Sequence, residues 1–192
     1  MAISRKLQEL LQEAKVKYTS VKHPVAYTAQ ELAAAQHVPG RQVAKSVLVK
    51  TSRGNVLAVP PAIQLIDFKK LKVLVGGGSI SIAKESDIKT QFPDVEVGAM
   101  SPFGNLYGVT VIVDSGLSAS DDIVFNAGSH TETIKMRYQD FARLVKPKMG
   151  TFGLPVQGPK KAAKRTASKK KPARAKKPAK RAARAKSKTK RR

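Results

Sequence analysis

The chain has 192 residues and a formal net charge of +24, which bounds it to one medium-sized domain with a charged appendage. It has no cysteine, which excludes disulfides, thiolate zinc sites and cysteine nucleophiles. No apolar run approaches the roughly 18 residues of a membrane-spanning helix, and residues 1–15 lack the apolar segment of a signal peptide. We therefore expect a cytoplasmic protein with no membrane partner.

The spacing of apolar residues predicts helices and strands in irregular alternation. Helical spacing over residues 1–15 is followed by a short strand within 16–24. The next helix, over 28–38, begins with Thr28 as the expected N-cap, and Glu31 completes a capping box. Beyond it, the expected strands are 46–50, 55–60, 79–83, a strand from residue 96 that runs into a loop, 109–114, 122–129 and 131–136. The further expected helices are 66–76, 84–92 and 137–145.

Helices and strands thus interleave, with adjacent strands near the end of the pattern. This order favours an α+β fold with a mixed sheet over a doubly wound fold. From about residue 146 the pattern ends, and residues 146–159 have the composition of a linker. We expect a domain over residues 1–150, followed over 151–192 by a linker and a tail.

The tail carries most of the excess charge. Residues 158–192 hold 18 lysines and arginines and no acidic residue, against 19 basic and 13 acidic residues in 1–157. Residues 160–192 contain no aromatic and no branched aliphatic side chain, so we expect this segment to be disordered when free. A polyanion, most simply a nucleic acid, is the expected partner.

Common catalytic and cofactor motifs are missing from the sequence. No GxxxxGK[ST] loop, no GxGxxG after a strand, no GxSxG elbow and no HExxH pair occurs, and the three histidines are far apart. The sequence therefore predicts no metal and no cofactor.

Three segments are unusual for a purely structural chain. In the expected strand QVAKSVLVK, residues 42–50, alternation places Lys45 on an otherwise apolar face. Residues 98–104, GAMSPFG, form a Gly/Pro-rich loop, and residues 125–133, FNAGSHTET, are dense in hydrogen-bonding side chains. Taken singly, these segments have structural interpretations: a lysine whose charged end reaches solvent, a tight turn and a polar hairpin. A functional reading requires that they converge in one cleft.

The segments KHPVAYT, VAKSVLVK, GAMSPFG and VFNAGSHTETIKM occur in this order and resemble the YbaK/EbsC family of aminoacyl-tRNA deacylases. The same fold serves as the editing insertion of bacterial prolyl-tRNA synthetase. The resemblance covers roughly residues 3–147 and implies a mixed, barrel-like sheet flanked by helices. It also implies hydrolysis of the ester between a wrong amino acid and the 3′ adenosine of a tRNA, for a small amino acid such as Ala, Ser, Thr or Cys.

The resemblance assigns the site residues by matching motifs. Lys45 would hold the terminal adenosine's phosphate or the aminoacyl group, and the backbone of the GxxxP loop would stabilise the developing oxyanion. The loop contributes Gly98, Ser101 and Pro102 to the catalytic set. The residues expected to bind the substrate are His23, Tyr27, Thr28, Met100, Phe103, Asn126, Gly128, Ser129 and His130.

The tail lies outside this resemblance and is similar to the tails of linker-histone-like proteins. Its expected phosphate-binding residues are Lys169, Lys170, Lys171, Arg174, Lys176, Lys177, Lys180 and Arg181. It would hold tRNA or DNA by charge neutralisation, or be a solvated extension without a partner. An aminoacyl-tRNA synthetase is a further expected partner. The alternative function is a non-catalytic nucleic-acid-binding or nucleoid-associated protein, and a small-molecule regulator is a third possibility.

Overall fold

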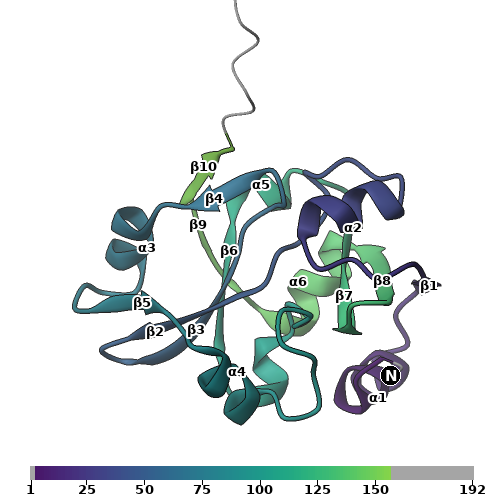
Figure 1. Ribbon diagram of the computed structural model, residues 1–192, viewed down its shortest axis with the longest axis horizontal. Coiled ribbons are helices and arrows are strands. Elements are labelled where there is room, and N and C mark those ends of the chain that lie inside the picture. The colour runs from purple at the N-terminus through teal and green to yellow at the C-terminus, as the bar shows by residue number, and fades with distance from the viewer. Residues whose placement is uncertain (1–2, 157–192) are drawn as a thin grey trace, which may run out of the picture. The chain divides into compact units, whose positions relative to one another are not determined.

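The computed structural model describes residues 3–156, and the predicted tail lies outside the described residues (Figure 1). The helices are α1 (Arg5–Glu13), α2 (Ala29–Ala35), α3 (Phe68–Leu74), α4 (Glu85–Gln91), α5 (Ser115–Ser118) and α6 (Tyr138–Val145), with a 3₁₀ turn at Gly104–Tyr107. The strands are β1 (Tyr18–Lys22), β2 (Val47–Thr51), β3 (Gly54–Val59), β4 (Gln64–Ile66), β5 (Ile80–Ile82), β6 (Thr110–Asp114), β7 (Asp122–Ser129), β8 (Glu132–Arg137), β9 (Lys148–Gly150) and β10 (Gly153–Pro155).

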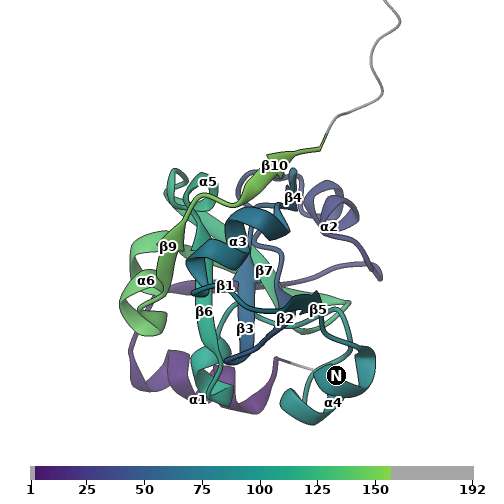
Figure 2. The same cartoon turned by 90° about the vertical axis from the view of Figure 1, so that its left-hand side faces the viewer.

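Two main sheets and a small third one organise these strands (Figures 1 and 2). The five-stranded sheet has the order β5-β2-β3-β6-β9, in which β6 runs parallel to β3 and β9, while β2 is antiparallel to β3 and β5. The three-stranded sheet β1-β8-β7 is antiparallel, and β4 pairs with β10. The architecture confirms the predicted α+β fold with a mixed sheet.

The centre of the five-stranded sheet is buried on both faces. Along β6, Val111 and Val113 join the main core, which the two large sheets share with α1 and α6, whereas Ile112 joins a second cluster with Leu71 of α3 and Phe152. Alternating side chains on opposite faces of a strand produce this division. The continuous β-branched run of β6 is therefore the pattern of a central strand covered on both sides.

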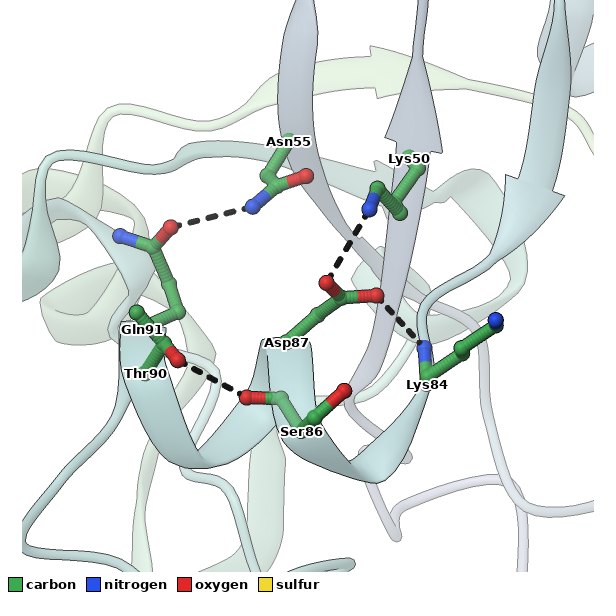
Figure 3. A network of polar contacts seen from close by, with 7 residues as sticks. All are labelled: Lys50, Asn55, Lys84, Ser86, Asp87, Thr90 and Gln91. Carbon is green, nitrogen blue, oxygen red and sulfur yellow. Dashed lines mark hydrogen bonds and ion pairs between the residues drawn. The ribbon is translucent and has the colours of Figure 1, made fainter.

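Polar contacts hold α4 against the β2–β3 hairpin (Figure 3). Lys50 of β2 donates to Asp87 at 3.0 Å, and Asn55 of β3 donates to Gln91 at 3.1 Å. The Asp87 carboxylate also accepts the backbone N–H of Lys84 at 3.0 Å, which caps the helix. This predicted helix is thus fixed at both ends to the hairpin that continues from Lys45.

Three of the sequence predictions differ from the structure. The strand expected from residue 96 is a turn, because Gly98 has a positive φ of 89° and Ala99 donates its N–H back to Glu96 O at 2.9 Å. The strand expected over residues 42–50 begins only at Val47. The reading of 146–159 as a linker is wrong for 148–155, since β9 pairs with β6 and β10 with β4.

No helix among residues 3–156 combines the length and the apolar character needed to cross a bilayer.

Candidate functional site

Lys45 lies where the chain passes from one sheet to the other. Ala44 donates its N–H to Val124 O of β7 at 2.8 Å, and Lys45 donates its N–H to Pro60 O, just after β3, at 2.9 Å. The backbone is therefore fixed on both sides of this residue before β2 begins at Val47. A lysine in this position projects from a rigid crossing rather than from the middle of a regular strand.

A cleft of about 430 Å³ opens at this crossing. Its walls come from the start of α2, the Lys45 segment, β4, the turn at Gly98 and β7. Lys45 and Gly98 line this same cleft, as the sequence interpretation requires. The other predicted site residues that line it are Tyr27, Thr28, Met100 and Asn126. A hollow of similar size, about 460 Å³, lies beside Asp121 and Arg137 but contains none of the predicted site residues.

The Lys45 side chain is half-buried, and its ammonium Nζ donates a hydrogen bond to Gln64 O of β4 at 2.8 Å. Burial lowers the pKa of Lys45 below its ordinary value of 10.5. Among residues 3–156, no carboxylate lies within ion-pair distance of this ammonium. The charge is consequently uncompensated by a counter-ion within this region and suited to an anionic or carbonyl group entering the cleft.

The turn at Gly98 presents backbone donors. Ala99 N–H is used within the turn, whereas the N–H groups of Gly98 and Met100 meet no acceptor among residues 3–156. Glu96 fixes the turn to the three-stranded sheet, because its N–H donates to Gly128 O at 2.9 Å and its carboxylate accepts the N–H of His130 at 3.0 Å. Two backbone donors on a fixed turn have the character of an oxyanion site.

The ring of His130 lies behind the Gly98 turn and does not line the cleft. Its Nδ1 is 3.1 Å from Ala26 O and its Nε2 is 2.9 Å from Val97 O, so the ring connects the segment before Tyr27 with the turn. A Cβ on Gly98 would come within 3.3 Å of the ring carbon Cε1. The structure therefore differs from the prediction: His130 connects two walls of the cleft, whereas we expected it to contact the amino acid directly.

The opposite rim is fixed by the capping box of α2. The Glu31 carboxylate accepts the N–H groups of Tyr27 at 2.9 Å and Thr28 at 3.1 Å, while Thr28 Oγ1 accepts Glu31 N–H at 3.1 Å. The bond from Thr28 N–H, followed by that from Tyr27, lowers the pKa of Glu31. The Tyr27 ring itself is 72% exposed and packs at 4.9 Å from the His130 ring. The predicted cap thus also shapes the edge of the cleft.

The remaining predicted site residues do not line the cleft. Phe103 is fully buried between Phe125 and Phe141, so it belongs to the core and does not line the substrate cleft as expected. Ser129 is fully buried, and Gly128 takes a φ of 115° where a Cβ would press on Ser4. The other three are buried and do not belong to the lining of the cleft: His23, Ser101 and Pro102.

Sequence reasoning missed several residues of the cleft. Ser46, Val47 and Leu65 line it, and Gln64 supplies the carbonyl that holds Lys45. Ser46 follows Lys45 directly in the sequence, and this position was the signal that could have identified it as a residue of the cleft. Leu65 and Gln64 belong to the three-residue strand β4, whose length is too short for a periodic pattern. Among residues 3–156, no three carboxylate or imidazole side chains gather as metal ligands would.

The sequence is similar to known proteins over most of the described residues. Residues 23–144 match the family described as the aminoacyl-tRNA editing domain. The prolyl-tRNA editing protein ProX of Acetoanaerobium sticklandii is 27% identical over 148 residues, covering 74% of this chain and 90% of that protein. The proline–tRNA ligase of Thermosipho africanus is 30% identical over 112 residues, covering 58% of this chain but only 20% of that enzyme.

A solved structure gives the same fold. The crystal structure of a proposed trans-editing enzyme for prolyl-tRNA synthetase superimposes with a TM-score of 0.70 at 19% identity, covering 79% of this chain and 96% of that chain. At this identity the likeness concerns the fold, whereas the family match spans more than half of the sequence and includes Lys45 and the Gly98 turn. The chain belongs to the aminoacyl-tRNA editing domain family.

Proposed function

We propose that the protein is a trans-editing deacylase that hydrolyses the ester of a mischarged aminoacyl-tRNA. The observation that carries the proposal is the shared cleft of about 430 Å³, in which Lys45 and the Gly98 turn meet. Membership of the editing-domain family supports this reaction class. The named activity of ProX, a relative that this chain matches over 90% of its length, supports action on tRNA as a free-standing protein.

The proposed reaction needs no protein nucleophile, because an aminoacyl ester is already activated. A water oxygen attacks the ester carbonyl carbon, the bond to the ribose oxygen breaks, and a water proton passes to that oxygen. The N–H groups of Gly98 and Met100 would stabilise the charge that develops on the carbonyl oxygen. The Lys45 ammonium, anchored on Gln64 O, would hold the terminal adenosine's phosphate or the aminoacyl group. The substrate's own ribose hydroxyl would orient the water.

The proposed substrates carry small side chains such as those of Ala, Ser, Thr or Cys. Tyr27 and Met100 lie on the cleft wall and are the residues whose volume would limit the amino acid. One methylene in such a pocket changes discrimination by only about 1–3 kcal/mol, so related amino acids are expected to be released at graded rates.

The proposed macromolecular partner is tRNA, held in addition by the basic residues of 158–192 through phosphate neutralisation. A synthetase is a second proposed partner, because part of this chain matches a segment of proline–tRNA ligases. DNA is the alternative polyanion for the same 18 basic residues.

The test is release of the amino acid from a panel of mischarged tRNAs by the full chain. We expect Lys45→Ala to abolish turnover while leaving the fold intact. Lys50→Ala is the matched control, since Lys50 lies on β2 five residues away and pairs with Asp87 outside the cleft. If Lys45→Ala releases the amino acid at the wild-type rate, the mechanism is wrong. Tight tRNA or DNA binding by a wild-type protein that releases no amino acid would instead favour the non-catalytic alternative.

A further inference from the structure

Residues 148–156, called here the C-terminal strap, pair first with β6 over 148–150 and then with β4, the strand that anchors Lys45, over 153–155 (Figures 1 and 2). In the pairing of β10 with β4, Leu154 is opposite Leu65 and Pro155 is opposite Gln64. Hydrogen bonds extend the contact at both ends: Asp67 N–H donates to Phe152 O at 2.7 Å, and Val156 N–H donates to Ile63 O at 3.0 Å. The strap therefore accompanies β4 over its whole length.

The strap is itself fixed firmly to the domain. Asp114, at the end of β6, is 1% exposed, and its Oδ2 accepts the N–H groups of Phe152 and Gly153 at 2.7 Å each. Its Oδ1 accepts Gly116 N–H at 2.8 Å. Phe152 is fully buried in the cluster that contains Leu71 and Ile112. A buried carboxylate and a buried ring thus set the position of residues 152–153.

Gln64 connects the strap to the cleft. Its backbone carbonyl accepts the hydrogen bond from Lys45 Nζ, and its side chain packs between two glycines. A Cβ built on Gly153 would overlap the Gln64 side-chain oxygen, and one on Gly116 would lie 2.9 Å from Gln64 Nε2. The side-chain oxygen of Gln64 is buried, so a methyl group at residue 153 would have to displace the side-chain amide of Gln64 against β4 and the strap.

We propose that the C-terminal strap is a positioning element for Lys45, in which Asp114 and Gly153 are positioning residues that act through Gln64. A lysine has four rotatable side-chain bonds and needs a fixed acceptor to place its ammonium. The strap lies beyond residues 23–144, so the family match assigns no role to it. The kinetic part of the inference rests on the proposed function, whereas its structural part does not.

The kinetic experiment uses the full chain with Gly153→Ala. Gly153 does not have a positive φ, so alanine fits the backbone and the added methyl acts through Gln64. We expect kcat to fall by about 10-fold or more, since displacements of about 1 Å at a reacting group cost up to about 100-fold, with KM changed by less than about 2-fold. Thr151→Ala is the control, because Thr151 lies in the same strap but its hydroxyl contacts Ser115.

A double variant tests the route. Gly153→Ala combined with Gln64→Ala removes the overlap but keeps the carbonyl at residue 64, so most of the lost kcat should return. If Gly153→Ala lowers kcat and the double variant does not recover it, the effect does not pass through Gln64 and the proposal is wrong. Unchanged kcat in Gly153→Ala, with an unchanged melting temperature, also overturns it.

A second readout is independent of activity. Lysine amines labelled by reductive ¹³C-methylation give NMR signals, and that of Lys45 is identified by its loss in Lys45→Arg. We expect the Lys45 signal to move towards those of exposed lysines in Gly153→Ala and to stay unchanged in Thr151→Ala. An unmoved signal overturns the proposal. If the wild-type chain releases no amino acid from any tRNA, the proposed function fails while this measurement still decides whether the strap positions Lys45.

Discussion

The carboxylate of Asp114 is expected to be a large single contribution to the stability of the domain. Asp114→Asn keeps the shape of the side chain but replaces one oxygen by an NH₂ group, which cannot accept a hydrogen bond. If the retained oxygen still accepts Gly116 N–H, the donors of Phe152 and Gly153 lose their acceptor in a site that is 1% exposed. Hydrogen bonds to charged groups contribute about 1.5–3 kcal/mol each, and partial relaxation reduces the sum. We expect the free energy of unfolding to fall by about 3 kcal/mol.

For a chain of this length, about 3 kcal/mol corresponds to a decrease in Tm of roughly 6–12 °C. Differential scanning calorimetry of the full chain measures it. Asp122→Asn is the matched control, since Asp122 pairs with Lys135 at 3.1 Å on the surface, where such pairs contribute about 0–1 kcal/mol. Equal decreases in the two variants would refute the reasoning, because they would show that burial and backbone donors add nothing at Asp114.

Three further predictions concern the cleft and the tail. Because burial lowers the pKa of Lys45, deacylation should decline on the alkaline side below pH 10.5. The unfolded chain keeps the proton of the Lys45 ammonium to higher pH than the folded chain does, so the free energy of unfolding should rise with pH between the lowered pKa and 10.5. A pH–rate profile checks the effect on activity, and urea unfolding of wild type and Lys45→Met checks the effect on stability. His130→Ala removes the ring whose Nδ1 and Nε2 lie 3.1 Å from Ala26 O and 2.9 Å from Val97 O, so the two walls lose this connection and kcat/KM should fall by about 10-fold, measured in single-turnover deacylation. Removing residues 158–192 should flatten the dependence of tRNA affinity on salt, since each neutralised phosphate contributes a slope of about −0.7 to −0.9; an unchanged slope would mean that the tail does not bind RNA.

Local signals in the sequence were sufficient for most of the helices and strands. The capping box of Thr28 and Glu31 forms as predicted, and the β2–β3 hairpin turns where expected. Strands β4, β9 and β10 were missed because each has three residues and none contains an apolar–polar–apolar alternation, whereas β5, equally short, shows this alternation in Ile80 and Ile82. These strands are specified by partners that lie far away in the sequence, and composition alone does not reveal such pairing.

The candidate site was predictable only in part. Lys45, Gly98 and Asn126 were named from the motifs, and they line one cleft. Their convergence is a tertiary property that spacing does not determine. Phe103 illustrates the limit, because its place in the same loop as Gly98 suggested the pocket, whereas its ring packs in the core against Phe125. The anchor of Lys45 was also invisible in the sequence, since a backbone carbonyl at Gln64 has no residue signature.

The late position of β9 and β10 in the chain has a consequence for folding and for truncation. Strand β6 gains its second neighbour, and β4 its only one among residues 3–156, from residues 148–155, which are synthesised after the other strands of this region. A chain shortened to residue 145 would leave both strands with open hydrogen-bonding edges, and such edges pair readily with other molecules. The shortened chain would therefore aggregate even though its main core is still complete. The nascent chain has the same tendency to aggregate until residues 148–155 have been synthesised.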